Sequence, residues 1–189
     1  HNTGYEGSCR TVQDSNAEVR GNTIEGNSAN GRAGGLAIFS AGGTLSENVI
    51  RDNEASWEAG GAGRIEGSHV ALINNAIMGN SLTGGGQGSG LYVFESLVTF
   101  LHTSFVSNRD GSGDGTGLYV HGSSTVTLTN TIIAAQETGI FVETDGLATA
   151  DGVLWYGNTA NTSGGGTITV EEAYTGDPAF DVDGYHLTE

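Results

Sequence analysis

Apolar residues recur along this chain in a series of similar stretches. The stretches are AEVRGNTIEGN, GTLSENVIRDN, VALINNAIMGN, VTFLHTSFVSN, VTLTNTIIAAQ and LATADGVLWYGN. Their central apolar residues lie 21 to 28 residues apart, at Ile24, Ile50, Ile77, Phe105, Ile133 and Leu154. An amide follows each of the first five after three residues, at Asn27, Asn53, Asn80, Asn108 and Gln136, and Asn158 follows Leu154 after four. A fixed period of this length indicates a repeat architecture.

A second stretch of each repeat alternates apolar and variable residues. It reads GLAIFS, GRIEGS, GLYVFES, GLYVHGS, GIFVETDG and TITVEEA. Alternation with period 2 predicts a strand with one buried face. The residues expected to point inward are Leu36/Ile38, Gly63/Ile65, Leu91/Val93, Leu118/Val120, Ile140/Val142 and Ile168/Val170.

A third strand precedes the central apolar residue, with inward pairs at Val70/Leu72, Val98/Phe100 and Val126/Leu128. Three short strands and three turns in each repeat predict an all-β fold, a single-stranded parallel β-helix (solenoid) of six to seven coils. Because coils stack about 4.8 Å apart, the amides are expected to form an Asn ladder along the axis. The β-helix is expected over residues 1–172, with 1–16 as a partial first coil, and 173–189 as an irregular tail.

The repeated GG-Φ-x-Φ and Φ-x-N-x-x-Φ-x-x-N patterns, in which Φ is apolar, carry a family resemblance. Over residues 17–172 the units resemble the right-handed parallel β-helix repeats of the pectate-lyase-like superfamily. In particular, they resemble the Gly/Asn-rich repeats of secreted and cell-surface bacterial proteins. The resemblance, together with the crossover preference of parallel strands, implies a right-handed coil. It also implies an extracellular or cell-surface location.

Charge excludes two classes of partner. The chain has 22 acidic and 6 basic residues, a net charge of −16, and all six basic residues are Arg. Nucleic acids and anionic membrane surfaces need a basic patch, which six scattered Arg cannot form. No apolar run approaches the roughly 20 residues of a spanning helix, so membrane insertion is not expected.

The outward positions of the second strand form two columns with aromatic and charged members. The columns are Ala37, Arg64, Tyr92, Tyr119, Phe141 and Thr169, and Phe39, Glu66, Phe94, His121, Glu143 and Glu171. The aromatic members predict an exposed strip that is edged by His121, Glu143 and Glu171. Such a strip suits another protein or the rings of a sugar. The alternative is that inserted loops fold over the aromatic rings and cover them.

The two glutamates that edge the strip raise the question of catalysis. Glu143 and Glu171 are expected on adjacent coils about 5 Å apart, the separation of carboxylates in a retaining glycosidase. Any two outward acids on neighbouring coils meet the same condition. The lyases that the repeats resemble add calcium-binding carboxylates and a basic residue, whereas this strip offers Arg64 alone. These two observations favour a protein that does not act as an enzyme.

Two further polar groups have both a functional and a structural interpretation. Asp110, Ser112 and Asp114 read D-x-S-x-D-G, a pattern that wraps calcium and equally forms a flexible turn. No other cofactor is expected. A column holding Glu47, Asn74, His102, Asn130 and Asp151 is expected to point inward, with His102 as a hydrogen-bonded bend residue rather than a ligand.

The function favoured by the sequence is a non-catalytic structural or adhesive module of a secreted or cell-surface bacterial protein. Open strand edges at the ends of a β-helix further predict that this segment either belongs to a longer solenoid or stacks end to end with copies of itself into filaments. The expected partners are other copies, other surface proteins or a polysaccharide. The alternatives are a carbohydrate-active enzyme, either a polysaccharide lyase or a glycoside hydrolase, and a carbohydrate-binding surface.

Overall fold

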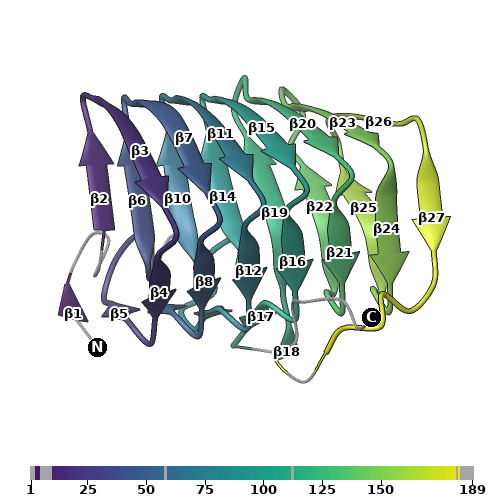
Figure 1. Ribbon diagram of the computed structural model, residues 1–189, viewed down its shortest axis with the longest axis horizontal. Helices are drawn as coiled ribbons and strands as arrows, with labels where there is room; N and C mark the ends of the chain where they lie inside the picture. The colour runs from purple at the N-terminus through teal and green to yellow at the C-terminus, as the bar shows by residue number, and fades with distance from the viewer. Residues whose placement is uncertain (1–2, 5–9, 58, 112, 182, 184–189) are drawn as a thin grey trace.

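The chain folds into one stack of parallel strands (Figure 1). The structure is a computed structural model that describes residues 3–4, 10–57, 59–111, 113–181 and 183. The strands of these residues form four sheets, which we name A to D, and each coil contributes one strand to each of sheets B, C and D before the next coil begins. No helix among the described residues has the length and apolar character needed to cross a membrane.

Three sheets contain seven strands each. Sheet B consists of β2 (Arg10–Gln13), β6 (Leu36–Phe39), β10 (Gly63–Glu66), β14 (Leu91–Phe94), β19 (Thr116–His121), β22 (Thr138–Val142) and β25 (Ala160–Gly164). Sheet C consists of β3 (Asn16–Arg20), β7 (Gly42–Ser46), β11 (His69–Ile73), β15 (Leu97–Leu101), β20 (Thr125–Thr129), β23 (Leu147–Asp151) and β26 (Thr167–Val170). Sheet D consists of β4 (Thr23–Glu25), β8 (Val49–Arg51), β12 (Ala76–Met78), β16 (Ser104–Val106), β21 (Ile132–Ala134), β24 (Val153–Tyr156) and β27 (Ala173–Thr175).

Sheet A, which the sequence did not predict, is built from strands of two residues. It consists of β1 (Thr3–Gly4), β5 (Ser28–Ala29), β9 (Glu54–Ala55), β13 (Ser81–Leu82), β17 (Arg109–Asp110) and β18 (Gly113–Asp114). The strands β5, β9, β13 and β17 each begin directly after an Asn, and β18 pairs antiparallel with β17. Strands this short carry no visible alternation, so the period of the sequence revealed three strands per coil instead of four.

In-register pairing builds the core. Residues at equivalent positions of successive strands are direct partners, for example Ile65 with Ile38 and Val93. The inward columns of sheets B, C and D therefore meet in one apolar interior, in which Phe100 and Phe105 pack edge to face with ring centroids 5.4 Å apart. The predicted all-β parallel solenoid is confirmed.

The Asn ladder is also confirmed (residues Asn27, Asn53, Asn80 and Asn108). Asn27 Nδ2 donates to Asn53 Oδ1 at 2.8 Å, and Asn53 Nδ2 and Asn80 Nδ2 each donate to the next Oδ1 at 3.0 Å. These side chains are buried, so the ladder satisfies polar groups that water cannot reach. Gln136 interrupts it, because its Oε1 has no hydrogen-bond partner among the described residues.

A second ladder occupies the corner between sheets C and D. Asn22 Nδ2 donates to Asn48 Oδ1 at 3.1 Å, and Asn48 Nδ2 donates to Asn75 Oδ1 at 3.0 Å. Thr103 continues the column by donating from Oγ1 to the carbonyl of Leu72. The signal was present in the sequence, because each of these Asn residues also follows an inward apolar residue after three positions.

Two assignments in the last coils were wrong. The inward partner of Ile133 is Trp155 rather than Leu154, so Asn158 keeps the three-residue spacing without a slip. TITV forms β26 of sheet C rather than a strand of sheet B. The strand of sheet B in this coil is β25, ANTSG, which lacks the apolar alternation that the other strands show. In addition, β27 continues sheet D beyond residue 172, into the segment expected to be irregular.

Candidate functional site

Aromatic rings stack along the outer face of sheet B. Tyr92, Tyr119 and Phe141 occupy equivalent positions of adjacent strands. The rings of Tyr92 and Tyr119 are 5.5 Å apart and 7° from parallel, and those of Tyr119 and Phe141 are 4.9 Å apart and 4° from parallel. Arg64 ends the stack with its Cζ 4.7 Å from the Tyr92 ring centroid, a cation–π contact. The in-register strands thus impose the stacking geometry.

The adjacent outward column connects the tyrosine hydroxyls to one another. Tyr92 Oη hydrogen-bonds to His121 Nδ1, and Tyr119 Oη donates to Glu143 Oε1. His121 Nε2 lies 3.3 Å from Glu143 Oε2. In one arrangement of protons, Tyr92 donates to His121 Nδ1 and Tyr119 donates to Glu143, while His121 Nε2 faces the other oxygen of the same carboxylate. The four side chains therefore form one connected network of two hydrogen bonds and the His121–Glu143 contact.

Burial and this network keep both phenols protonated. Burial, followed by the hydrogen bond to Glu143, holds the pKa of Tyr119 above its ordinary value. Burial also raises the pKa of Tyr92, against the opposing charge of Arg64. Neither phenol is thus prepared to act as a base near neutral pH.

The aromatic strip is less exposed than the sequence predicted. Tyr92 and Tyr119 are only 7% and 4% exposed. Ala59 packs against them, and a Cβ on Gly88 would lie 3.0 Å from the Cβ of Tyr119. The inserted loops therefore cover the tyrosines, which is the alternative that the sequence left open. The half-buried side chains of Phe94, His121, Phe141 and Glu143 form the accessible rim of the stack, which we call the sheet B rim.

The predicted pair of catalytic carboxylates does not exist. Glu171 follows β26 in sheet C, whereas Glu143 follows β22 in sheet B. The strand beside β22 is β25, and Val142 pairs with Gly164 there. Among the described residues, β25 therefore places no second carboxylate beside Glu143 at the position that a retaining glycosidase would need. Thr169, assigned to the same face, also belongs to sheet C, and Ser163 takes its place beside Phe141.

The sequence proposed for calcium folds into a tight hairpin. Asp110 pairs with Gly113, and Arg109 pairs with Asp114, across the turn between β17 and β18. Ser112 and the side chain of Asp114 lie outside the described residues, so calcium binding stays a prediction of the sequence. Within the described part of the chain, no three His, Cys, Asp or Glu side chains gather in a group that could hold a metal ion.

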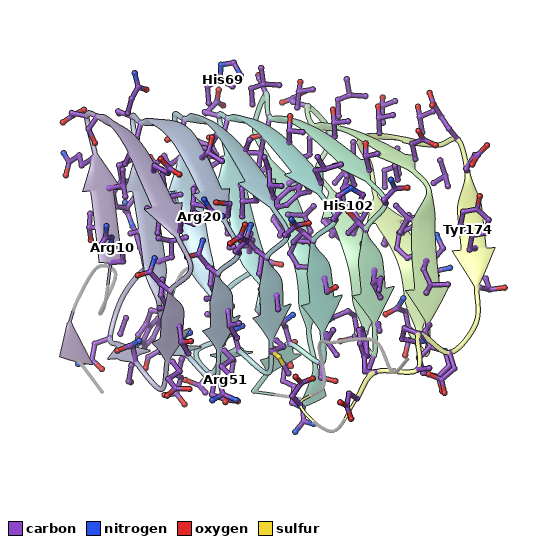
Figure 2. The ribbon with its side chains drawn as sticks, viewed as in Figure 1. Arg10, Arg20, Arg51, His69, His102 and Tyr174 are labelled. Atoms are coloured by element: carbon purple, nitrogen blue, oxygen red, sulfur yellow. The ribbon has the colours of Figure 1, made fainter. Side chains whose placement is uncertain are left out.

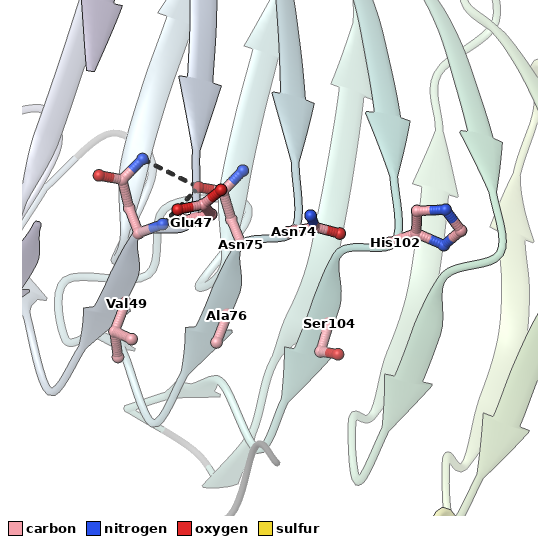
Figure 3. A pocket seen from close by; sticks show the side chains of 8 residues that line it. Glu47, Val49, Asn74, Asn75, Ala76, His102 and Ser104 are labelled. Atoms are coloured by element: carbon pink, nitrogen blue, oxygen red, sulfur yellow. Dashed lines mark hydrogen bonds between the residues drawn. The ribbon is translucent and has the colours of Figure 1, made fainter. Parts of the chain in front are cut away.

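A hollow of about 430 Å³ follows the corner between sheets C and D. Glu47, Asn74 and His102 succeed one another along it, each in the left-handed backbone region (Figure 3). Arg20 lies at the same corner (Figure 2). It holds Glu47 through two hydrogen bonds of 2.9 and 3.1 Å. The prediction that Glu47, Asn74 and His102 point inward was wrong, because a corner residue with positive φ turns its side chain outward and the following Asn or Thr points in.

Stacked coils, amide ladders and an uninterrupted apolar interior define a right-handed parallel β-helix. A family model described as "Right handed beta helix region" matches residues 1–149, and the chain belongs to this family. None of the curated proteins compared with the chain matches it.

Proposed function

We propose that this β-helix is a non-catalytic adhesive module and that the sheet B rim is its contact surface. The observation that carries the proposal is the closed network of Tyr92, His121, Glu143 and Tyr119. Each polar group in it is already engaged with another member. The network holds the two phenols and His121 against neighbouring side chains, and β25 brings no second carboxylate beside Glu143, so the described residues supply no acid–base pair here.

The same network gives the rim a fixed shape. His121 is held between Tyr92 and Glu143, and its ring also lies 5.1 Å from the Phe94 ring. Side chains held in this way lose little conformational entropy when a partner binds. Aromatic rings beside a carboxylate and an imidazole suit either a sugar ring or a polar protein surface. The proposed partners are therefore a polysaccharide or another surface protein, in an extracellular or cell-surface setting.

The experiment is a binding measurement on an array of immobilised glycans, together with a turnover assay on the same glycans. We expect retention of a glycan without turnover, and at least about ten-fold weaker retention for Phe94→Ala and His121→Ala. His102→Ala is the matched control, since His102 is an exposed histidine at a different corner. Turnover, or equal loss in the control and in both rim variants, would overturn the proposal.

Axial self-association is a second candidate function. The strands β25, β26 and β27 are the last of their sheets, and their outer edges have no partner strand among the described residues. Charge along the axis is uneven as well, because no Arg or Lys follows Arg109. Edge strands of this kind pair readily with other chains. Concentration-dependent growth of rods in negative-stain images supports this candidate, and a single monomeric species at the highest soluble concentration excludes it.

A further inference from the structure

The ring stack of sheet B is closed at one end and open at the other. At the first end Arg64, itself buried, covers the ring of Tyr92. At the other end the outward neighbour of Phe141 in the next strand is Ser163, whose side chain is short and exposed. One face of the Phe141 ring lies against Tyr119, and no second ring lies on its other face within the described part of the chain. The stack therefore ends on a ring face without an aromatic partner.

The loops that cover the tyrosines are replaced by short turns at this end. The connections that precede β10 and β14 consist of residues 56–62 and 83–90. By contrast, the chain passes from β21 to β22 through residues 135–137 and from β24 to β25 through residues 157–159. Because these turns are short, Phe141 is only half-buried, whereas both tyrosines are buried. The lengths of the connections thus decide where the stack is accessible.

Beyond Phe141 the protein offers space and hydrogen-bonding groups rather than another ring. The residues after Ser163 are three glycines, Gly164–Gly166, which carry no side chain. The side chain of Glu143 is 40% exposed, and each of its oxygens makes one contact within the tyrosine network. A carboxylate has about four lone-pair positions, so Glu143 can accept further hydrogen bonds. The hydroxyl of Ser163 makes no hydrogen bond within the described part of the chain.

We propose that the open face of Phe141 binds one neutral sugar ring of a glycan. The inference rests on the proposed function, because Phe141 and Glu143 belong to the sheet B rim. The apolar face of a sugar ring can stack on the aromatic ring, and the hydroxyls at its edge can donate to Glu143 and bond to Ser163. A tyrosine or tryptophan of a partner protein would also stack, but each has a single polar group to offer these residues.

Charge favours a neutral sugar over an acidic one. The chain has a net charge of −16, and its last basic residue is Arg109. The carboxylate of a uronic acid placed against Phe141 would meet the like charge of Glu143. Neither β22 nor β25 contains an Arg or Lys that could compensate this repulsion. A neutral ring avoids it and can still use every hydrogen-bonding group at the site.

The measurement is retention on the immobilised glycans, repeated with Ser163→Tyr. This variant places a ring of the protein itself on the open face of Phe141 and leaves the sheet B rim unchanged. We expect retention of neutral glycans to be at least about thirty-fold weaker. Ser163→Ala keeps the space and should retain them within about five-fold of the wild-type chain. At least one methyl glycoside of glucose, galactose or mannose should compete for retention, and the methyl glycosides of the uronic acids should not.

The matched control is Thr169→Tyr, which places the same ring on the outer face of sheet C in the same coil and should keep wild-type retention. Circular dichroism verifies that each variant is folded, and Ser163→Leu fills the same space if Ser163→Tyr is not. Wild-type retention by the folded Ser163 variants, together with loss in Phe94→Ala and His121→Ala, overturns this inference and leaves the proposed function standing.

Three further results would contradict the inference. Equal losses in Ser163→Tyr and Thr169→Tyr would mean that the added ring does not act by filling the site. Competition by the uronic acid glycosides as strong as by the neutral ones would contradict the charge argument. A wild-type chain that retains no glycan would overturn this inference together with glycan binding by the sheet B rim.

Discussion

His121 Nε2 lies 3.3 Å from Glu143 Oε2, and this contact joins the two stacked tyrosines through their hydroxyls. His121 and Glu143 are outward residues of neighbouring coils. Without Glu143, Tyr119 would lose its acceptor and His121 would lose the partner of Nε2. The rim of sheet B is thus held in place by side chains of three successive coils, from Tyr92 to Glu143.

Alkaline pH should destabilise the fold through these tyrosines. The pKa of both phenols is raised in the folded chain, by burial first. The unfolded chain therefore releases these protons first, once the pH passes the ordinary tyrosine pKa of about 10. The contribution of these raised pKa values to the free energy of unfolding is fully present below about pH 10 and falls as the pH rises further. Urea unfolding between pH 8 and 11.5 measures it.

The variant Tyr92→Phe/Tyr119→Phe is the control for that measurement. It removes both titrating groups while keeping the rings in the stack. Its urea midpoint should fall less steeply above pH 10 than that of the wild-type chain. Parallel pH profiles for the two proteins would show that the phenols do not contribute.

Removing one buried rung of the Asn ladder should be costly. Asn80 accepts from the backbone N–H and the Nδ2 of Asn53 and donates to Asn108 Oδ1 and the carbonyl of Ile50. Asn80→Ala leaves several of these buried groups unpaired, and we expect the free energy of unfolding to fall by about 3 kcal/mol.

The matched control for Asn80 is Asn74→Gly, an exposed Asn of the same coil. Its φ of 53° suits glycine without strain, so the free energy of unfolding should change by less than about 1 kcal/mol. Urea unfolding followed by circular dichroism compares the two variants. Equal losses in both would mean that the ladder bonds are not what stabilises this turn.

Gln136→Asn should stabilise the protein. The buried Oε1 of Gln136 has no partner among the described residues, and the side chain is one methylene longer than those of the preceding rungs. Asparagine at this position would place its oxygen where Asn108 can donate to it, as Asn53 donates to Asn80. Satisfying a buried acceptor is worth roughly 1–3 kcal/mol, and loss of the methylene offsets roughly 1 kcal/mol of it. The urea midpoint should rise, and a lower midpoint would contradict the ladder geometry at this coil.

Close packing of loops should make one glycine irreplaceable. A Cβ on Gly61 would lie 2.2 Å from the carbonyl oxygen of Ser89, so Gly61→Ala forces the backbone of the next coil to move. We expect a loss of several kcal/mol in stability, as for other overpacked sites. Gly165→Ala is the control, since its closest neighbour is a side-chain oxygen at 3.2 Å. Equal melting temperatures for the two variants would contradict this close approach.

The sequence predicted the parts of the fold that depend on local periodicity. The inward pairs Leu91/Val93 and Leu118/Val120 and the ladder of Asn53, Asn80 and Asn108 lie where alternation and spacing placed them. The strand TITV was placed in the wrong sheet because the strands of sheets B and C share the same alternation. The true strand, ANTSG, shows no such alternation, so the period of the sequence could not identify it.

The sequence predicted which residues form the candidate site, but it did not predict how far loops cover them. The alignment of Tyr92, Tyr119 and Phe141 followed from the repeat, and so did the neighbouring His121 and Glu143. The burial of the tyrosines depends on loops of variable length, whose path no period describes. Likewise, Glu171 was placed beside Glu143 only through the misassigned strand.

The most direct test of the proposed function is turnover of polysaccharides. Neutral and acidic polysaccharides are incubated with the wild-type chain and with Glu143→Gln, and new reducing ends and unsaturated uronates are measured. The closed network of Glu143, His121 and the two tyrosines predicts no release above the buffer blank for either protein. Release of product by the wild-type chain would contradict a non-catalytic module, and its loss in Glu143→Gln would locate the activity on sheet B.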